Sequence, residues 1–231
     1  MNSSGSETVV RAPAINEPFC CSWSGGKDSC LALHRAAAGG AIPQVLLTLF
    51  TEDETRTRSH GLHRSVVEAQ ADALGLELRT VSTSWENYRE SLVALLEEAR
   101  QDGMKSVVFG DIDIEAHRDW ELAVARDAGL SGFLPLWGFE RRDVLDEWWQ
   151  LGFEARIVVV RDGVMSRDYL GRTLDSGLAS ELEAQGIDAC GENGEFHTLA
   201  TNGPLFRHSL KILAGEPVQR ADCWVEDLRV A

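Results

Sequence analysis

Short apolar runs alternate with amphipathic stretches from about residue 18 onward, and this alternation restricts the fold more than any other feature of the chain. The apolar runs are candidate strands at residues 19–23, 44–50, 77–82 and 106–110. Between them, apolar residues recur three and four positions apart, as they do on one face of a helix. This alternation is typical of βα units in one parallel sheet. The sequence therefore predicts a doubly wound α/β domain over about residues 18–132.

The ends of the chain differ from this central pattern. Residues 1–17 are rich in small and polar types without any period, and we expect a mobile tail there. After residue 133 the predicted elements are a helix at 141–151, a strand at 155–160, a short helix at 178–184, and weakly alternating edge strands at 205–212 and 222–230. We interpret residues 133–231 as a second, smaller α+β domain.

Composition limits the classes of protein that the chain can belong to. With 44% hydrophobic and 26% charged residues, the chain has the balance of a globular protein. Neither a run of about 20 apolar residues nor the apolar core of a signal peptide is present. We therefore expect a soluble cytoplasmic protein that does not bind membranes.

Charge and cysteine content exclude further classes. A net charge of -15 argues against broad binding to nucleic acid, which needs a basic surface to displace counterions. The five cysteines include no CxxC pair, which indicates free thiols instead of a disulfide framework or a zinc site.

Directly after the first apolar run, and directly before a helix, the chain carries a short loop of glycine, hydroxyl and charged residues. The loop consists of Ser24, Gly25, Gly26, Lys27, Asp28 and Ser29. Consecutive glycines let the backbone turn sharply and bring its N–H groups close to an anion, and the serine hydroxyls add donors. The positive end of the following helix faces the same anion. Lys27 is a mobile charge suited to phosphate, and Asp28 is suited to holding Mg²⁺.

The loop differs from the common GxxxxGK[ST] phosphate loop, which would need glycine at Cys21 and serine or threonine at Asp28. It also lacks the GxGxxG pattern of dinucleotide-binding folds. A tight strand-to-helix turn would explain the glycines and Ser29, but it would leave Lys27 without a role. We therefore interpret residues 24–29 as a phosphate-binding loop.

A second loop, at residues 190–198, is too rich in glycine and acid for a packed strand. Its carboxylates, Glu192 and Glu195, and its imidazole, His197, suit Mg²⁺, ammonium or an amine. The alternative is a set of glycine turns with both carboxylates solvated.

Charged residues also follow the fourth predicted strand. Asp111 lies at the strand end, where ligands bind in open α/β sheets. Asp111 and Asp113 suit a metal ion, and a solvated loop is the alternative. His117 and Arg118 begin the next predicted helix, where they either contact a ligand or form an exposed helix start.

The loop SGGKDS resembles the PP-loop of the N-type ATP pyrophosphatases. Further matching stretches are Ser59-His60-Gly61, Gly110-Asp111-Ile112, His117-Arg118-Asp119-Trp120, Pro135-Leu136-Trp137-Gly138 and Cys190-Gly191-Glu192-Asn193-Gly194-Glu195-Phe196-His197-Thr198. In combination these stretches resemble the diphthine-ammonia ligase family over about residues 18–206. The resemblance implies a sheet of the adenine nucleotide alpha hydrolase type.

The resemblance also implies a reaction. ATP would adenylate a carboxylate acceptor, either diphthine on elongation factor 2 or another protein or small acceptor in bacteria, and ammonia would then displace AMP after pyrophosphate has left. Because no glutaminase domain is present, free ammonia would be the nitrogen source. ATP and Mg²⁺ are the implied cofactors.

The implied site residues fall into three groups. The nucleotide would bind Ser24, Gly25, Gly26, Lys27, Asp28 and Ser29, with Mg²⁺ on Asp28. Catalysis would use Lys27, Asp28, Glu192, Glu195 and His197. The acceptor or ammonia would contact His60, Asp111, Asn193 and Thr198.

Two other functions and a homo-oligomeric state stay open. Relatives with the same loop modify tRNA, although those that transfer sulfur usually carry CxxC pairs, which this chain lacks. A regulator that binds ATP without turnover would have no need of both Lys27 and the acidic loop.

Overall fold

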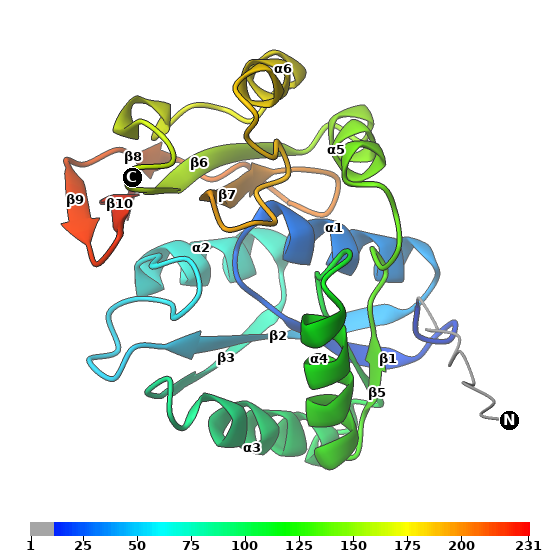
Figure 1. The fold of residues 1–231 in the computed structure, drawn as a ribbon. Coiled ribbons are helices and arrows are strands. Elements are labelled where there is room, and N and C mark those ends of the chain that lie inside the picture. The colour runs from blue at the N-terminus through cyan, green and yellow to red at the C-terminus, as the bar shows by residue number, and fades with distance from the viewer. Residues whose placement is uncertain (1–11) are drawn as a thin grey trace, which may run out of the picture.

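The computed structural model describes residues 12–231 of the chain (Figure 1). A parallel sheet of five strands forms the centre of the first half, in the order β3-β2-β1-β4-β5. The strands are β1 (Pro18–Ser22), β2 (Ile42–Phe50), β3 (Glu77–Ser82), β4 (Ser106–Val108) and β5 (Ser131–Phe133). The four predicted strands are present, and the short β5 joins them at the edge. The predicted doubly wound α/β class is confirmed.

Helices cover both faces of this sheet because successive residues of each strand point to opposite sides. Phe19 and Cys21 of β1 pack with α1 (Lys27–Ala38) and α2 (Arg64–Leu74). The residue between them, Cys20, packs on the other face with α3 (Tyr88–Gln101) and α4 (Glu115–Asp127).

The second half adds an antiparallel sheet in the order β7-β6-β10-β9. Its elements are α5 (Arg141–Gln150), β6 (Glu154–Arg161), the 3-10 helix η1 (Arg167–Tyr169), α6 (Ser176–Ala184), β7 (Phe196–Asn202), β9 (Pro217–Arg220) and β10 (Cys223–Glu226). The strands β8 (Ile212–Leu213) and β11 (Arg229–Val230) form a separate pair. This smaller α+β region is the one expected from the sequence.

The two halves share one hydrophobic core. Leu31 and Leu33 of α1 belong to the same buried cluster as Ile157 of β6 and Leu199 of β7. Figure 1 shows α1 and α2 lying between the parallel sheet and the antiparallel sheet. These helices therefore bury apolar residues on two sides.

Several segments differ from their predicted form. Residues 196–198, predicted as loop, begin β7, because β6 pairs with them and buries Phe196 and Thr198. The edge strand predicted at 205–212 is wrong: among the described residues of that segment only Ile212 lies in a strand. Of the predicted tail, residues 1–11 lie outside the described residues, whereas the N–H of Asn16 donates to the Gly40 carbonyl at 2.8 Å.

Within residues 12–231, no helix is long and apolar enough to cross a membrane.

Candidate functional site

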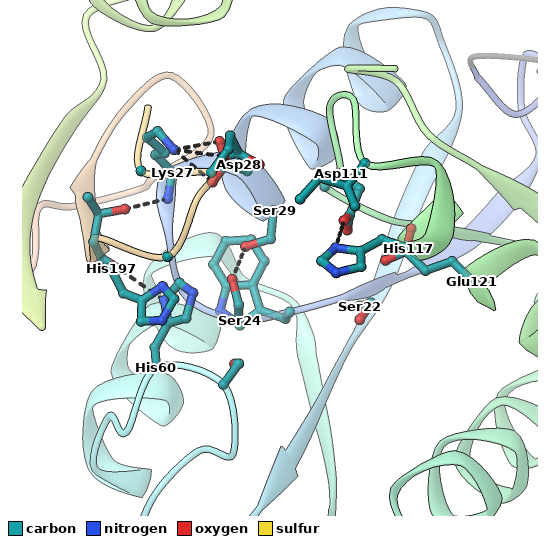
Figure 2. Close-up of a pocket in the computed structure, with 18 of the residues that line it drawn as sticks. Ser22, Ser24, Lys27, Asp28, Ser29, His60, Asp111, His117, Glu121 and His197 are labelled. Atoms are coloured by element: carbon teal, nitrogen blue, oxygen red, sulfur yellow. Dashed lines mark hydrogen bonds and ion pairs between the residues drawn. The ribbon is translucent and has the colours of Figure 1, made fainter. Parts of the chain in front are cut away.

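A cleft of about 370 Å³ lies at the carboxyl edge of the parallel sheet. The strand order reverses between β1 and β4, because β2 and β3 lie on one side of β1 whereas β4 and β5 lie on the other. Ligands of open α/β sheets bind at such a switch point. Both halves of the protein line the cleft, as Figure 2 shows. Its lining includes Ser24, Lys27, Asp111, Glu192, His197 and Thr198.

The loop at residues 24–29 connects β1 to α1 in a conformation that glycine makes accessible. Gly25 has a φ of +84°, in the left-handed region that other residues rarely adopt. At Gly26, which caps α1, a Cβ atom would come within 2.5 Å of the His60 ring. Gly26 has no side chain to cap α1, and the Lys27 N–H in the first turn donates to the Thr198 hydroxyl at 3.1 Å. This first turn lines the cleft, so the positive end of the helix faces it.

Lys27 is almost fully buried, at 4% exposure, and lies among acidic groups. Its Nζ is 2.8 Å from Asp28 Oδ1 and 3.5 Å from Glu192 Oε1, and it also donates to the Cys190 carbonyl. Burial acts to lower the pKa of Lys27, but Asp28, Cys190 and Glu192 outweigh burial and hold this pKa above its usual value. Lys27 is therefore charged at neutral pH.

The surroundings of Glu192 favour its neutral form, because Lys27 is a single positive group beside the two carboxyl groups of Asp28 and Glu192. Burial and the neighbouring charge of Asp28 raise the pKa of Glu192 to about 8. Lys27 acts in the other direction on Glu192, without cancelling these effects. The cleft therefore holds an excess of acidic groups near Lys27.

Two histidines form one wall of the cleft. The rings of His60 and His197 stack with centroids 4.4 Å apart, and His60 Nδ1 is 3.1 Å from the Thr198 carbonyl oxygen. Burial lowers the pKa of both rings. For His197, burial together with the charges of Lys27 and Arg161 lowers the pKa to about 4. This wall is therefore neutral at pH 7, and the expected position of His60 at the cleft is observed.

The opposite wall carries acidic residues from the end of β4 and from α4. Asp111 Oδ1 is 2.8 Å from His117 Nδ1. Glu121, one helical turn after His117, is only 9% exposed, and burial and the nearby Asp111 raise its pKa well above the usual value. The sequence analysis missed Glu121. The available signal was its place on the apolar face of α4, where Val124 and Ala125 are also buried.

Six of the predicted residues do not line the cleft: the loop glycines Gly25 and Gly26, and Asp113, Arg118, Asn193 and Glu195. Asn193 donates through Nδ2 to Glu195 Oε1 at 3.1 Å, so these two side chains pair with each other behind the loop. Arg141 donates to Asp113 at 2.6 Å and to Asn193 at 3.2 Å. Arg118 pairs with its neighbour Asp119. Glu192 is thus the glutamate of the acidic loop that reaches the cleft.

A divalent metal has a suitable set of groups in this cleft. Ligand atoms of Asp28, Cys190 and Glu192 lie within 4.8 Å of one another. Mg²⁺ prefers carboxylate and phosphate oxygens over a thiol, so Asp28 and Glu192 fit this ion and Cys190 does not.

The fold and the site together define a class: a doubly wound α/β protein with a glycine loop and a buried lysine at the switch point of its sheet. Models of two protein families match the chain, the diphthamide synthase N-terminal domain over residues 19–132 and the diphthamide synthase C-terminal domain over residues 140–228. The chain therefore belongs to the diphthine-ammonia ligase family, a family of ligases.

Two mammalian relatives agree with this assignment. The chain is 29% identical to a diphthine-ammonia ligase of Rattus norvegicus and 27% identical to that of Homo sapiens. Each alignment covers 84% of this chain and 82% of the relative. A crystal structure of a predicted subunit of tRNA methyltransferase from Methanocaldococcus jannaschii is 15% identical, with a TM-score of 0.44, over 80% of this chain and 97% of that one.

Proposed function

We propose that the protein is an ATP-dependent amide ligase. It adenylates an acceptor carboxylate, releases pyrophosphate, and then lets ammonia displace AMP to form the amide. The names of the relatives support diphthine as the acceptor. We propose diphthine on elongation factor 2, or a different carboxylate if the source is bacterial. The observation that carries the proposal is the buried, charged Lys27 in a glycine loop at the switch point of the sheet.

The phosphates of ATP would occupy the end of the cleft next to α1. The N–H groups of the loop, the hydroxyls of Ser24 and Ser29, and Lys27 are the donors there. Asp28 and Glu192 would hold Mg²⁺, which when bound neutralises part of the phosphate charge. Lys27 is positioned to offset the charge that develops as pyrophosphate leaves.

The acceptor and ammonia would occupy the acidic side of the cleft. The carboxylate of Asp111 disfavours a bare triphosphate and suits a cationic group, and a bound cation would favour the charged form of Glu192 beside it. His60 and Thr198 would contact the acceptor, and His197, kept neutral by burial, would accept a hydrogen bond from ammonium without taking its proton. Glu195 and Asn193 would not contact the ligand. The hydrogen bond between their side chains would fix the shape of the acidic loop.

Analysis of the nucleotide products tests the proposal. With ammonium and an acceptor present, the wild-type protein should release AMP and pyrophosphate, and the Lys27→Ala variant should lose about 10²-fold or more of this activity. Chromatography of the nucleotides and a pyrophosphate assay measure both.

Release of ADP and orthophosphate would contradict the proposal, as would wild-type turnover in the Lys27→Ala variant. Pyrophosphate release that depends on tRNA and not on ammonium would favour a tRNA-modifying enzyme. ATP binding without any turnover would favour a regulator.

A further inference from the structure

Gln70, in α2, is fully buried, and its side-chain amide joins three separate segments. Its Oε1 accepts from the indole Nε1 of Trp23 at 3.0 Å. Its Nε2 donates to the Gly25 carbonyl at 2.9 Å and to the Ala200 carbonyl, on β7, at 2.8 Å. Both amide hydrogens and the amide oxygen are thus used.

Trp23 determines which way the amide faces. An indole N–H can only donate, so the side-chain oxygen of Gln70 must point toward Trp23. The NH₂ group is therefore directed at the two carbonyls, one in the phosphate loop and one in β7. A flipped amide would place the side-chain oxygen of Gln70 against the carbonyl oxygens of Gly25 and Ala200. It would also place the NH₂ group against the indole N–H of Trp23.

The Gly25 carbonyl accepts a second hydrogen bond, from the N–H of Ala200 at 2.9 Å. In a trans peptide the carbonyl and the following N–H point in opposite directions. With the carbonyl held against α2 and β7, the N–H of Gly26 points the other way and donates to Ser24 Oγ at 3.3 Å. Ser24 lines the cleft.

We propose that Gln70 is a positioning residue for the phosphate loop: by holding the Gly25 carbonyl against β7, it fixes the Gly26 N–H and, through the bond from this N–H to Ser24 Oγ, directs the Ser24 hydroxyl toward a phosphate oxygen of the bound nucleotide. This inference rests on the proposed function, which supplies the nucleotide. A hydroxyl fixed before the ligand arrives donates without the entropy cost of ordering the loop. Gln70 thereby links the nucleotide end of the cleft to the second half of the protein.

The Gln70→Met variant tests the proposal, because methionine has a similar length but cannot hydrogen-bond to the carbonyls. We expect affinity for ATP and for pyrophosphate to fall about tenfold, the KM for ATP to rise by a similar factor, and kcat to change less. Hydrogen exchange at residues 24–29 should become faster. Trp23→Phe, which removes the group that orients the amide, should have the same effects to a smaller degree.

Trp149→Phe is the matched control. The indole of Trp149 donates to the Leu174 carbonyl at 2.8 Å in the second half, and Trp149 does not line the cleft. This variant should lose stability and keep its affinity for ATP. Calorimetry, hydrogen exchange and thermal unfolding on all four proteins give the comparison.

The proposal is overturned if Gln70→Met and Trp23→Phe both bind ATP and pyrophosphate within twofold of the wild type. It is also overturned if Trp149→Phe weakens binding as much as they do, since that would make the effect one of general stability. Failure of the proposed function looks different. In that case the wild-type protein forms no AMP, while its pyrophosphate affinity still reports on Gln70.

Discussion

At the scale of single residues, the stacked pair of His60 and His197 is the feature most sensitive to acid. Both rings are held neutral because burial disfavours their charged forms. In the unfolded chain each ring would bind a proton near the ordinary histidine pKa of 6.5. Between that value and about 4 the unfolded state binds more protons than the folded state. Stability supplied by these rings is therefore complete above pH 6.5 and is lost as the pH falls.

The His197→Phe variant tests this linkage, because phenylalanine keeps a flat ring against His60 and has no proton to bind. We expect the free energy of unfolding to drop less between about pH 7 and pH 4.5 in this variant than in the wild type. Urea unfolding at several pH values measures the difference. Parallel curves for the two proteins would contradict the prediction.

The sequence identified those cleft residues that belong to a recognisable motif, such as Lys27 and His60. It missed Glu121 and Gln70, because a polar residue inside an amphipathic helix shows its inward direction only when the partners across the core are known. For a related reason, the sequence did not show that Asn193 and Glu195 lie outside the lining of the cleft. Neighbours on a loop point in different directions, and the backbone decides which of them reaches the cleft.

At the scale of elements, β7 supports the loop at residues 24–29 from a distant part of the chain. The Thr198 hydroxyl accepts from the Lys27 N–H at 3.1 Å, and the Thr198 carbonyl faces His60. The sequence predicted the β3 range, 77–82, as observed, since its apolar run has clear ends. It missed the start of β7 because the preceding glycines mask the pairing with β6, and it missed β5 because the sequence Ser131-Gly132-Phe133 contains no apolar run.

Thr198→Val should weaken both stability and ATP binding. The substitution keeps the shape of the side chain but leaves the Lys27 N–H without its acceptor, which costs about 1–3 kcal/mol of unfolding free energy. Thr201→Val, on the same strand, is the control, because the Thr201 hydroxyl donates to the Glu154 carbonyl away from the loop. Urea unfolding and calorimetry with ATP distinguish the two. Equal ATP affinity in both variants would show that Thr198 does not support the loop.

At the scale of the whole molecule, α1 and α2 belong to a core that both sheets complete. The alternation of apolar runs predicted the parallel sheet, because each βα unit is encoded locally. It could not predict the shared core, which depends on contacts between residues far apart in sequence. We propose that the chain divides near residue 133 into two regions that differ in architecture, and that neither region is stable without the other.

A chain shortened to residues 1–138 tests this dependence. Without β6 and β7, apolar side chains such as Leu31 and Leu33 of α1 lose their cover. We expect no cooperative thermal transition and no measurable ATP binding, in contrast to the full chain. Circular dichroism and calorimetry provide the measurements. A sharp transition with ATP affinity would show that the first half folds alone.

The contact between Lys27 and Thr198 also has a consequence during synthesis. The two residues are 171 positions apart, so the ribosome has made most of the chain before the loop meets its partner. Early elements such as β1 and α1 leave the ribosome first. One face of these elements stays uncovered until the residues that complete the site have been made. A nucleotide bound as proposed would therefore stabilise this protein only near the end of translation, and until then the uncovered apolar face of the nascent chain is exposed to aggregation.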